Sequence, residues 1–220
     1  MKMINPIELA IVLFSLTITL ALPGLGVLFA FIALLVYLLI GDRRKKFESV
    51  GFNRPKNWVS LILITLIFGI ILELGFQSIV EPVIEKALGS KLDLSNLEGI
   101  KGDPLNYILL LTIGWLVGGF LEEVLFRGFL LDRISQLFNN RKLGNILAIL
   151  ITSTVFGLAH MYQGYPGVIA TGLISVILGV VYVNSKKVLW YSVFIHGFNN
   201  TVGITIIFLD LENSLSSLFF

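Results

Sequence analysis

Long stretches of this sequence carry almost no charge, and they constrain the fold more than any other feature. Only 14% of the 220 residues are Asp, Glu, Lys or Arg, and 56% are hydrophobic, whereas soluble domains have about 25% charged residues. A helix needs roughly 20 apolar residues to cross a hydrocarbon core. Because the chain offers that length several times, we predict an all-α, polytopic membrane bundle in contact with lipid.

The apolar stretches predict about seven transmembrane helices, within a range of six to eight. The uncertainty comes from residues 7–40, which form either two short spans or one span interrupted at Pro23-Gly24, and from 80–105, where an additional short helix would fit. The predicted spans are residues 7–22, 25–40, 58–79, 106–131, 143–161, 166–183 and 188–209.

No polar stretch is long enough for a separate soluble domain, so residues 1–220 are expected to form a single transmembrane domain. The formal net charge of +2 gives no support for a nucleic-acid partner. The absence of cysteine excludes disulfide bonds, thiolate zinc sites and a cysteine nucleophile.

Basic residues are concentrated in alternate loops. The loops 41–57, 132–142 and 184–187 are rich in Lys and Arg, whereas 80–105 and 161–165 are not. Positively charged short loops mark the cytoplasmic side of a membrane protein. We therefore expect a cytoplasmic N-terminus and an outer C-terminus, in what we take to be a prokaryotic cell membrane.

Three ionisable residues interrupt the predicted span 106–131, namely Glu122, Glu123 and Arg127. A charge inside a membrane helix costs a few kcal/mol or more, so such residues usually have a function. Glu123 and Arg127 are one helical turn apart, which predicts an ion pair, while Glu122 points about 100° away. Taken alone, the motif suits a structural ion pair as well as a catalytic group.

The two histidines of the chain, His160 and His196, both fall in apolar segments. Asn200 follows His196 by four residues on the same helical face, so both side chains can donate hydrogen bonds to one oxygen, as an oxyanion hole requires. Glu122 and a neutral His160 have the chemistry to hold and deprotonate a water molecule. Two such histidines beside a spare carboxylate predict a buried polar site among the helices.

Several hydrolytic mechanisms are excluded. The sequence has no His-Glu-x-x-His zinc signature and no Gly-x-Ser-x-Gly elbow. Every Asp lies outside the predicted spans, which excludes an intramembrane aspartyl pair. Water activated by Glu and His, with or without a metal, remains.

These fragments, in this order, resemble the CPBP family, which contains CAAX prenyl proteases of the Ras-converting endopeptidase type and bacteriocin-processing enzymes. The family pattern is Glu-Glu-x-x-x-Arg, then Phe-x-x-x-His, then His-x-x-x-Asn or His-x-x-x-Asp. The resemblance covers about residues 106–205, which we take as the catalytic core. The corresponding segments are Glu122-Glu123-Val-Leu-Phe-Arg127, Phe156-Gly-Leu-Ala-His160 and His196-Gly-Phe-Asn-Asn200.

The resemblance implies a catalytic role for each polar residue of these motifs. Glu122 would activate water and His160 would position it. His196 and Asn200 would form the oxyanion hole. The site would be oriented by two further residues, Glu123 and Arg127.

The resemblance is compatible with both a metal-dependent and a metal-free mechanism. Family members are often labelled metalloproteases, while a metal-free glutamate mechanism is also proposed for them. Zinc or another divalent metal would have Glu122, His160 and His196 as its ligands. These three residues have no recognised zinc-binding spacing, so we expect no obligatory cofactor.

The leading hypothesis is an intramembrane endopeptidase that cleaves a membrane-associated or CAAX-like peptide or protein, with or without a lipid anchor. One alternative is a non-catalytic bacteriocin-immunity protein that binds a partner. Another is a proton-coupled transporter, to which Glu73 would add a further carboxylate. His196 with Asn200 favours the hydrolase, because an oxyanion hole has no special place in a proton relay.

One expectation conflicts with this site. If a helix starts at residue 143, Glu122 lies near the cytoplasmic end of its span and His160 near the outer end of its own. At 1.5 Å per residue, their depths differ by roughly 15–20 Å. We therefore expect the predicted boundaries within 132–148 to be the least accurate.

Overall fold

The computed structural model describes residues 4–40 and 42–212, and every regular element within them is a helix. The predicted all-α membrane bundle is confirmed. Four helices of the described residues are long and apolar enough to cross a membrane, and α1 and α2 are shorter apolar helices. The principal helices are α1 (Pro6–Ala21), α2 (Gly26–Leu39), α3 (Arg43–Ser49), α4 (Trp58–Gly75), α5 (Glu81–Leu88), α6 (Pro104–Ile113), α7 (Asp132–Ser135), α8 (Arg141–Ala159), α9 (Gly164–Asn184) and α10 (Trp190–Phe208).

Polar side chains fix where these helices begin. Asn5, Asn57, Asp103 and Asn140 precede α1, α4, α6 and α8, and each accepts a hydrogen bond from a backbone N–H of the first turn. Such caps satisfy backbone donors that have no partner within the helix. The apolar runs that follow then continue as helices.

Two of the long helices are composite. Residues Trp58–Leu88 join α4 to α5 through the π-helical segment η1 (Phe76–Val80). Residues Pro104–Ser135 join α6 to α7 through two π-helical segments, η3 (Gly114–Glu122) and η4 (Val124–Leu131). We call Pro104–Ser135 the motif helix.

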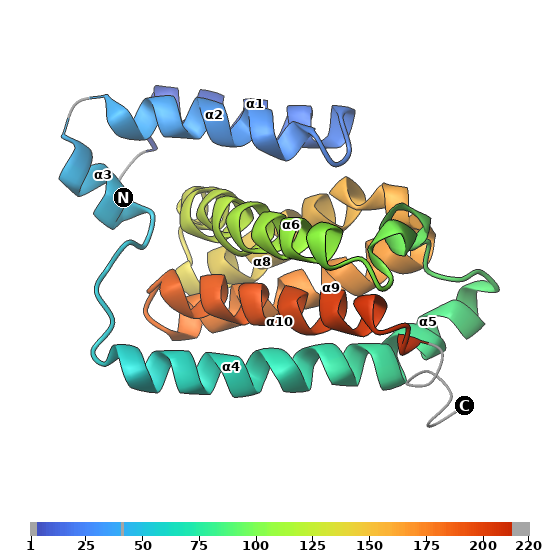
Figure 1. Ribbon diagram of the computed structural model, residues 1–220. Helices are drawn as coiled ribbons and strands as arrows, with labels where there is room; N and C mark the ends of the chain where they lie inside the picture. The colour runs from blue at the N-terminus through green and yellow to red at the C-terminus, as the bar shows by residue number, and fades with distance from the viewer. Residues whose placement is uncertain (1–3, 41, 213–220) are drawn as a thin grey trace.

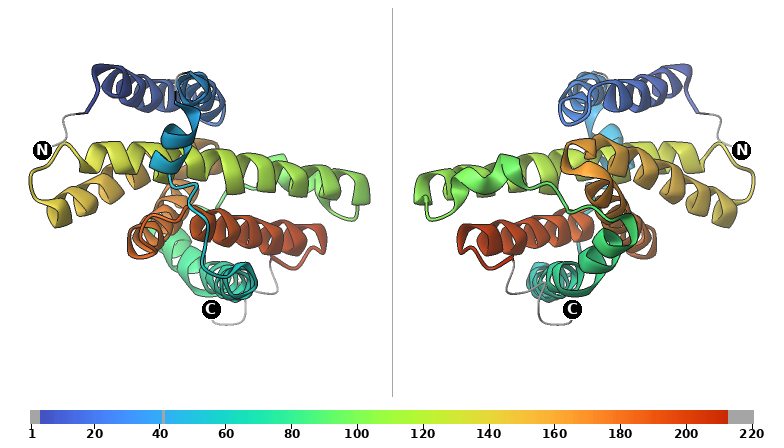
Figure 2. Two further views of the ribbon diagram at one scale, coloured as in Figure 1. Left: turned by 90° about the vertical axis from the view of Figure 1, so that its left-hand side faces the viewer. Right: turned by 90° about the vertical axis from the view of Figure 1, so that its right-hand side faces the viewer.

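The bundle has an N-terminal hairpin on one side and α4 on the other. The antiparallel helices α1 and α2 lie at the top of Figure 1 and α4 along its base, with the remaining long helices between them. The side views agree with this order (Figure 2). The core lies along the motif helix, where every residue from Val124 to Leu131 is buried.

Residues 7–40 form two helices rather than one interrupted helix. They are joined at Gly24, whose positive φ of 83° suits glycine.

The prediction that residues 132–142 form a link was wrong for its first part, since the motif helix continues to Ser135. Charged residues ended the predicted span, yet Asp132 and Arg133 are buried in the last helical turn. Their charges are compensated, because Asp132 pairs with both Arg133 and Lys187. Glu122 therefore lies near the middle of the motif helix, which removes most of the depth difference from His160.

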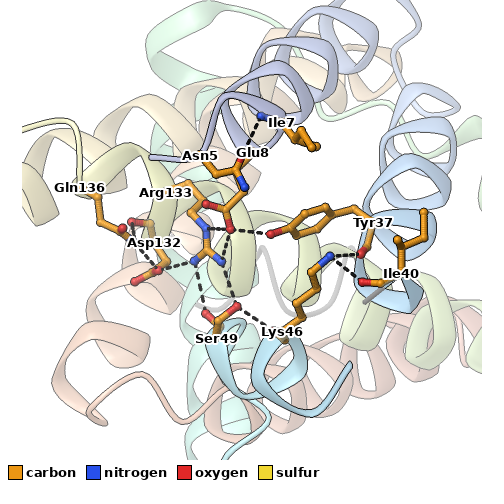
Figure 3. A network of polar contacts seen from close by, with 10 residues as sticks. All are labelled: Asn5, Ile7, Glu8, Tyr37, Ile40, Lys46, Ser49, Asp132, Arg133 and Gln136. Atoms are coloured by element: carbon orange, nitrogen blue, oxygen red, sulfur yellow. Dashed lines mark hydrogen bonds and ion pairs between the residues drawn. The ribbon is translucent and has the colours of Figure 1, made fainter. Parts of the chain in front are cut away.

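A polar network holds the N-terminal hairpin against this end of the motif helix (Figure 3). Arg133 donates to Glu8 of α1 at 2.9 Å and to the Ser49 hydroxyl at 2.9 Å. The hydroxyl of Tyr37 in α2 donates to the same Glu8 oxygen at 2.8 Å. We call Glu8, Tyr37, Ser49, Asp132 and Arg133 the hairpin network.

The two ends of the bundle differ in charge. The basic loops, described over residues 42–57, 132–142 and 184–187, gather at one end, where Leu189 N–H donates to the Gly51 carbonyl. The hairpin network lies at the same end (Figure 3). The other end contains the Gly24 turn, the loop after α5 and the end of α10. Eleven Lys and Arg residues lie in the three basic loops, against three in residues 80–105.

Candidate active site

A buried ion pair lies at the centre of the motif helix. The expected pairing of Glu123 with Arg127 is present, with 2.7 Å between Glu123 Oε1 and an Arg127 guanidinium nitrogen. The same Glu123 oxygen lies 2.8 Å from His196 Nδ1 on α10. Glu123 is wholly buried and Arg127 is 1% exposed. Glu123 therefore connects the motif helix to the histidine of the third motif.

The hydrogen-bond partners fix the orientation of His196. A carboxylate that already accepts from Arg127 can only accept from the imidazole, so Nδ1–H of His196 is the donor. Its other ring nitrogen, Nε2, lies 4.0 Å from Glu122 Oε2. His196 thus stands between the two adjacent glutamates.

Glu122 differs from Glu123 in its surroundings. It is mostly buried, but no hydrogen bond joins its carboxylate to any of the described residues. His160 and His196, when protonated, act on it electrostatically with opposite charge, as does Arg127. Its carboxylate faces a cavity, which leaves it free to hold a water molecule.

His160 directly follows α8, at the end of the bundle remote from the basic loops. Its Nδ1 lies 2.8 Å from the Phe156 carbonyl, which can only accept, so Nδ1 carries a hydrogen and Nε2 is free. Its ring packs against those of Phe156 and Tyr162. The adjacent Ala159 carbonyl accepts from Gly24 N–H at 3.0 Å, so the turn of the N-terminal hairpin supports this segment.

Asn200 lies one helical turn beyond His196 on α10. Its amide Nδ2 donates to the Gly114 carbonyl of the motif helix at 2.9 Å. An amide nitrogen has two hydrogens, so one stays available after this bond. The partner carbonyl was not predicted, because nothing in the sequence shows that Gly114 and Asn200 are neighbours.

Glycines at the helix contact were also missed. A Cβ at Gly118 would lie 2.5 Å from Asn200 Nδ2 and 3.5 Å from His196 Nε2. Gly119 packs against Gly197 of α10, and a Cβ at Gly119 would lie 3.2 Å from the Cα of Gly197. The signal was available: Gly114, Gly118 and Glu122 recur every four residues, and small residues allow close helix contact in membranes.

The motif helix is π-helical around the two glutamates, over Gly114–Glu122 and Val124–Leu131. Such segments are rare and are often found at functional sites. Sequence periodicity predicts an ordinary α-helix here, since nothing in the residue pattern distinguishes the two.

Four of the six predicted site residues line one cavity of about 490 Å³. Glu122, His160, His196 and Asn200 reach it from the motif helix, the end of α8 and α10. Glu123 and Arg127 do not line this cavity; they lie behind His196 and hold its Nδ1 side. The structure thus brings together all three motifs.

The proposed metal ligands share this cavity but do not form a ready metal site. Within residues 4–40 and 42–212, no group of three or more His, Asp or Glu side chains is arranged to hold a metal ion. Each histidine has its Nδ1 engaged, by Glu123 or by the Phe156 carbonyl, so Nε2 is the nitrogen that each presents to the cavity. The groups that face the cavity, a carboxylate and two imidazoles, have hydrolytic chemistry of their own.

Comparison with known families matches residues 104–202 to the family described as "Type II CAAX prenyl endopeptidase Rce1-like". This segment contains all six site residues. The chain is also 25% identical over 178 residues to "Putative membrane peptidase YdiL" of Bacillus subtilis (strain 168), covering 81% of this chain and 69% of that protein. No solved structure matches. The match over residues 104–202, just under half of the chain, and this curated relative support the resemblance to the CPBP family of intramembrane proteases.

Proposed function

We propose that this membrane peptidase is an endopeptidase that cleaves a membrane-associated peptide within the cavity described above. The observation that carries the proposal is the convergence of Glu122, His160, His196 and Asn200, from three separate helical segments, on one cavity. Their chemistry divides into a pair that activates water and a pair that donates hydrogen bonds.

Glu122 and His160 are the proposed water-activating pair. The Glu122 carboxylate has no hydrogen-bond partner among the described residues, and His160 has a free Nε2. A water held by both groups attacks the scissile carbonyl carbon, and its proton moves to Glu122. When the tetrahedral intermediate collapses, the C–N bond breaks and Glu122 delivers that proton to the leaving amine.

His196 and Asn200 are the proposed oxyanion hole. His196 Nδ1–H donates to Glu123, so its Nε2 can donate to an oxyanion only when the ring carries both protons. The Glu123 carboxylate stabilises that imidazolium, and Arg127 holds Glu123 in place through their 2.7 Å ion pair. Asn200 supplies its second amide hydrogen. Each such donor contributes about 2.7–4 kcal/mol of transition-state stabilisation.

The position of the cavity indicates from which side of the membrane a substrate reaches it. Most of the segment 91–97 lines it, as does Gln163, whose carbonyl accepts from Asp93 N–H, and this segment lies at the end of the bundle opposite the basic loops. Basic loops face the cytoplasm, so we propose that the N-terminus is cytoplasmic and that the cavity opens at the outer face of a prokaryotic cell membrane. An exported peptide would reach it directly, whereas a cytosolic CAAX-like peptide would meet the opposite end.

Single-cysteine labelling tests this orientation, because the chain has no cysteine of its own. Ser90→Cys lies in the loop after α5 and Asn53→Cys in the basic loop before α4, and both positions are exposed. In intact cells, a membrane-impermeant maleimide should label Ser90→Cys and spare Asn53→Cys. The reverse pattern would contradict the proposed orientation.

Peptide cleavage by the purified protein tests the activity. Wild type should cleave members of a proteome-derived peptide pool at reproducible sites, identified by mass spectrometry. Glu122→Ala and His160→Ala should lose these cleavages, whereas Glu98→Gln, an exposed carboxylate outside the cavity, should keep them. If both cavity variants cleave like wild type, the assignment is wrong.

A further inference from the structure

The cavity continues past the proposed catalytic groups to a second set of polar residues. Glu73, Gln77 and Glu81 recur every four residues along Trp58–Leu88, so they share one face of that helix, and all three line the cavity. Asn199 of α10 lines it as well. We call these four residues the acidic subsite; none of them takes part in the proposed hydrolysis.

The carboxylates of the acidic subsite lack a cation. Neither Glu73 nor Glu81 forms an ion pair with any described residue, and the hydrogen bonds that Glu73 accepts come from uncharged amides, Gln77 Nε2 at 3.2 Å and the Asn199 side chain. Glu73 is nevertheless buried, at 8% exposed. An ionisable residue within a membrane helix is costly without a partner, so the subsite is incomplete in the chain alone.

Two amides point to the kind of group that is missing. Asn199 is 6% exposed, and its Oδ1 has no hydrogen-bond partner among the described residues; the same holds for Gln77 Oε1. These atoms, like the Glu73 carboxylate, accept hydrogen bonds and cannot donate them. The complementary ligand is therefore a hydrogen-bond donor with positive charge.

The packing of α10 makes room for this arrangement and places it near the proposed reaction centre. Gly203 faces Glu73, and a Cβ there would lie 2.5 Å from Glu73 Oε1. Asn199 and Asn200 are adjacent in the chain, one in the acidic subsite and the other in the proposed oxyanion hole. A group bound at the subsite would thus belong to a residue close to the scissile bond.

The end of the bundle where the cavity opens also has an excess of negatively charged side chains, which favours a cationic ligand. The segment 80–105 contains five carboxylates against three lysines, and three of the carboxylates, Glu81, Glu85 and Asp93, line the cavity against one lysine, Lys91. Asp93 is exposed, and hydrogen bonds from Ser95 hold the pKa of its carboxyl below the usual value. A negative rim of this kind attracts cations and raises their rate of association.

We propose that the acidic subsite binds the ammonium or guanidinium group of a Lys or Arg side chain near the scissile bond of the substrate. The subsite makes the enzyme selective for a cationic residue at a fixed distance from the cleaved bond. This inference rests on the proposed peptidase function and names the substrate class of that site.

A binding experiment tests the subsite without requiring cleavage. The probes are two fluorescein-labelled mixtures of apolar decapeptides, one with a fixed Arg and the other with citrulline, its uncharged isostere, at that position. Their affinities are measured for the Glu122→Ala protein and for the same protein with Glu73→Gln. The Arg mixture should bind at least about tenfold more tightly, since hydrogen bonds to charged groups are the stronger ones, and Glu73→Gln should remove that preference. Glu98→Gln, outside the cavity, should preserve it.

Equal binding of the two mixtures, or a preference that survives Glu73→Gln, overturns the inference. If Glu73→Gln does not fold, Asn199→Leu, which replaces the amide with an apolar side chain of similar size, should reduce the preference instead. An unchanged preference in a folded Asn199→Leu protein also counts against the subsite.

Cleavage by the otherwise unmodified protein separates this inference from the proposed function. Sites cleaved by wild type should be enriched in Lys or Arg at one position, and Glu73→Gln should lose the enrichment while still cleaving. Cleavage without the enrichment refutes the subsite and leaves the peptidase. An Arg preference in binding without any cleavage refutes the peptidase and leaves a cation-binding cavity.

Discussion

Gly118 offers a sharp test of the proposed oxyanion hole, because it is not one of the motif residues. In Gly118→Ala the new Cβ would lie 2.5 Å from Asn200 Nδ2, about 1 Å closer than an ordinary contact. The Asn200 amide has to move, and its 2.9 Å hydrogen bond to the Gly114 carbonyl is disturbed with it. The Cβ would also lie 3.5 Å from His196 Nε2, an ordinary contact that leaves the histidine in place.

The expected result is a fall in kcat of about 10²-fold or more, the effect of losing one oxyanion donor. Folding should be little affected, because replacing Gly by Ala within a helix contributes up to about 1 kcal/mol of favourable helix propensity, which offsets part of the strain. The assay compares kcat and thermal unfolding in detergent for Gly118→Ala and for the matched control Gly75→Ala, which has nothing within 4 Å of its new Cβ. A folded Gly118→Ala enzyme with kcat within twofold of wild type would refute the oxyanion-hole geometry.

Three further outcomes are expected. Glu123→Gln should lower kcat by about 10²-fold, because the neutral amide no longer stabilises a protonated His196; unchanged kcat would contradict the role given to Glu123. Arg133→Met should lower the free energy of unfolding by about 3 kcal/mol, since Glu8 and Asp132 lose their buried partner; the exposed Arg54→Met serves as control in thermal unfolding, and equal midpoints for both variants would argue against the hairpin network. A chelator should leave peptide cleavage unchanged, and loss of activity that zinc restores would contradict a metal-free mechanism.

Much of the fold follows from hydrophobic length alone. The predicted span 58–79 begins where α4 begins, because Asn57 caps the apolar run that follows. The helices α8 and α9 likewise begin and end within two residues of the predicted spans 143–161 and 166–183. Residues 80–105, where a short extra helix was considered, contain the continuation of α4 into α5 and a short 3-10 helix at Ser95–Ile100.

The end of the motif helix could not be predicted, because it depends on partners distant in sequence. Asp132 and Arg133 look like loop residues until Glu8 and Lys187 are brought beside them. Because these charges are paired, they can be buried within the helix, and the helix continues past residue 131. The same error produced the expected depth conflict between Glu122 and His160.

The site was predictable where its residues share a helix and unpredictable where they face one another. Helical spacing gave the Glu123–Arg127 pair. It gave neither the bond from His196 to Glu123 nor the one from Asn200 to Gly114, which join α10 to the motif helix. It also could not show that Glu73, on a different helix, lines the same cavity as Glu122.

The central claim is that Glu122 and His160 act as one unit on a single water molecule. A double-mutant cycle on peptide cleavage, using kcat/KM of wild type, Glu122→Gln, His160→Ala and the double variant, measures this coupling directly. Residues that act as a unit are strongly non-additive, so the double variant should be about as slow as the slower single variant. Losses that multiply would mean that the two residues act independently, and would contradict the account.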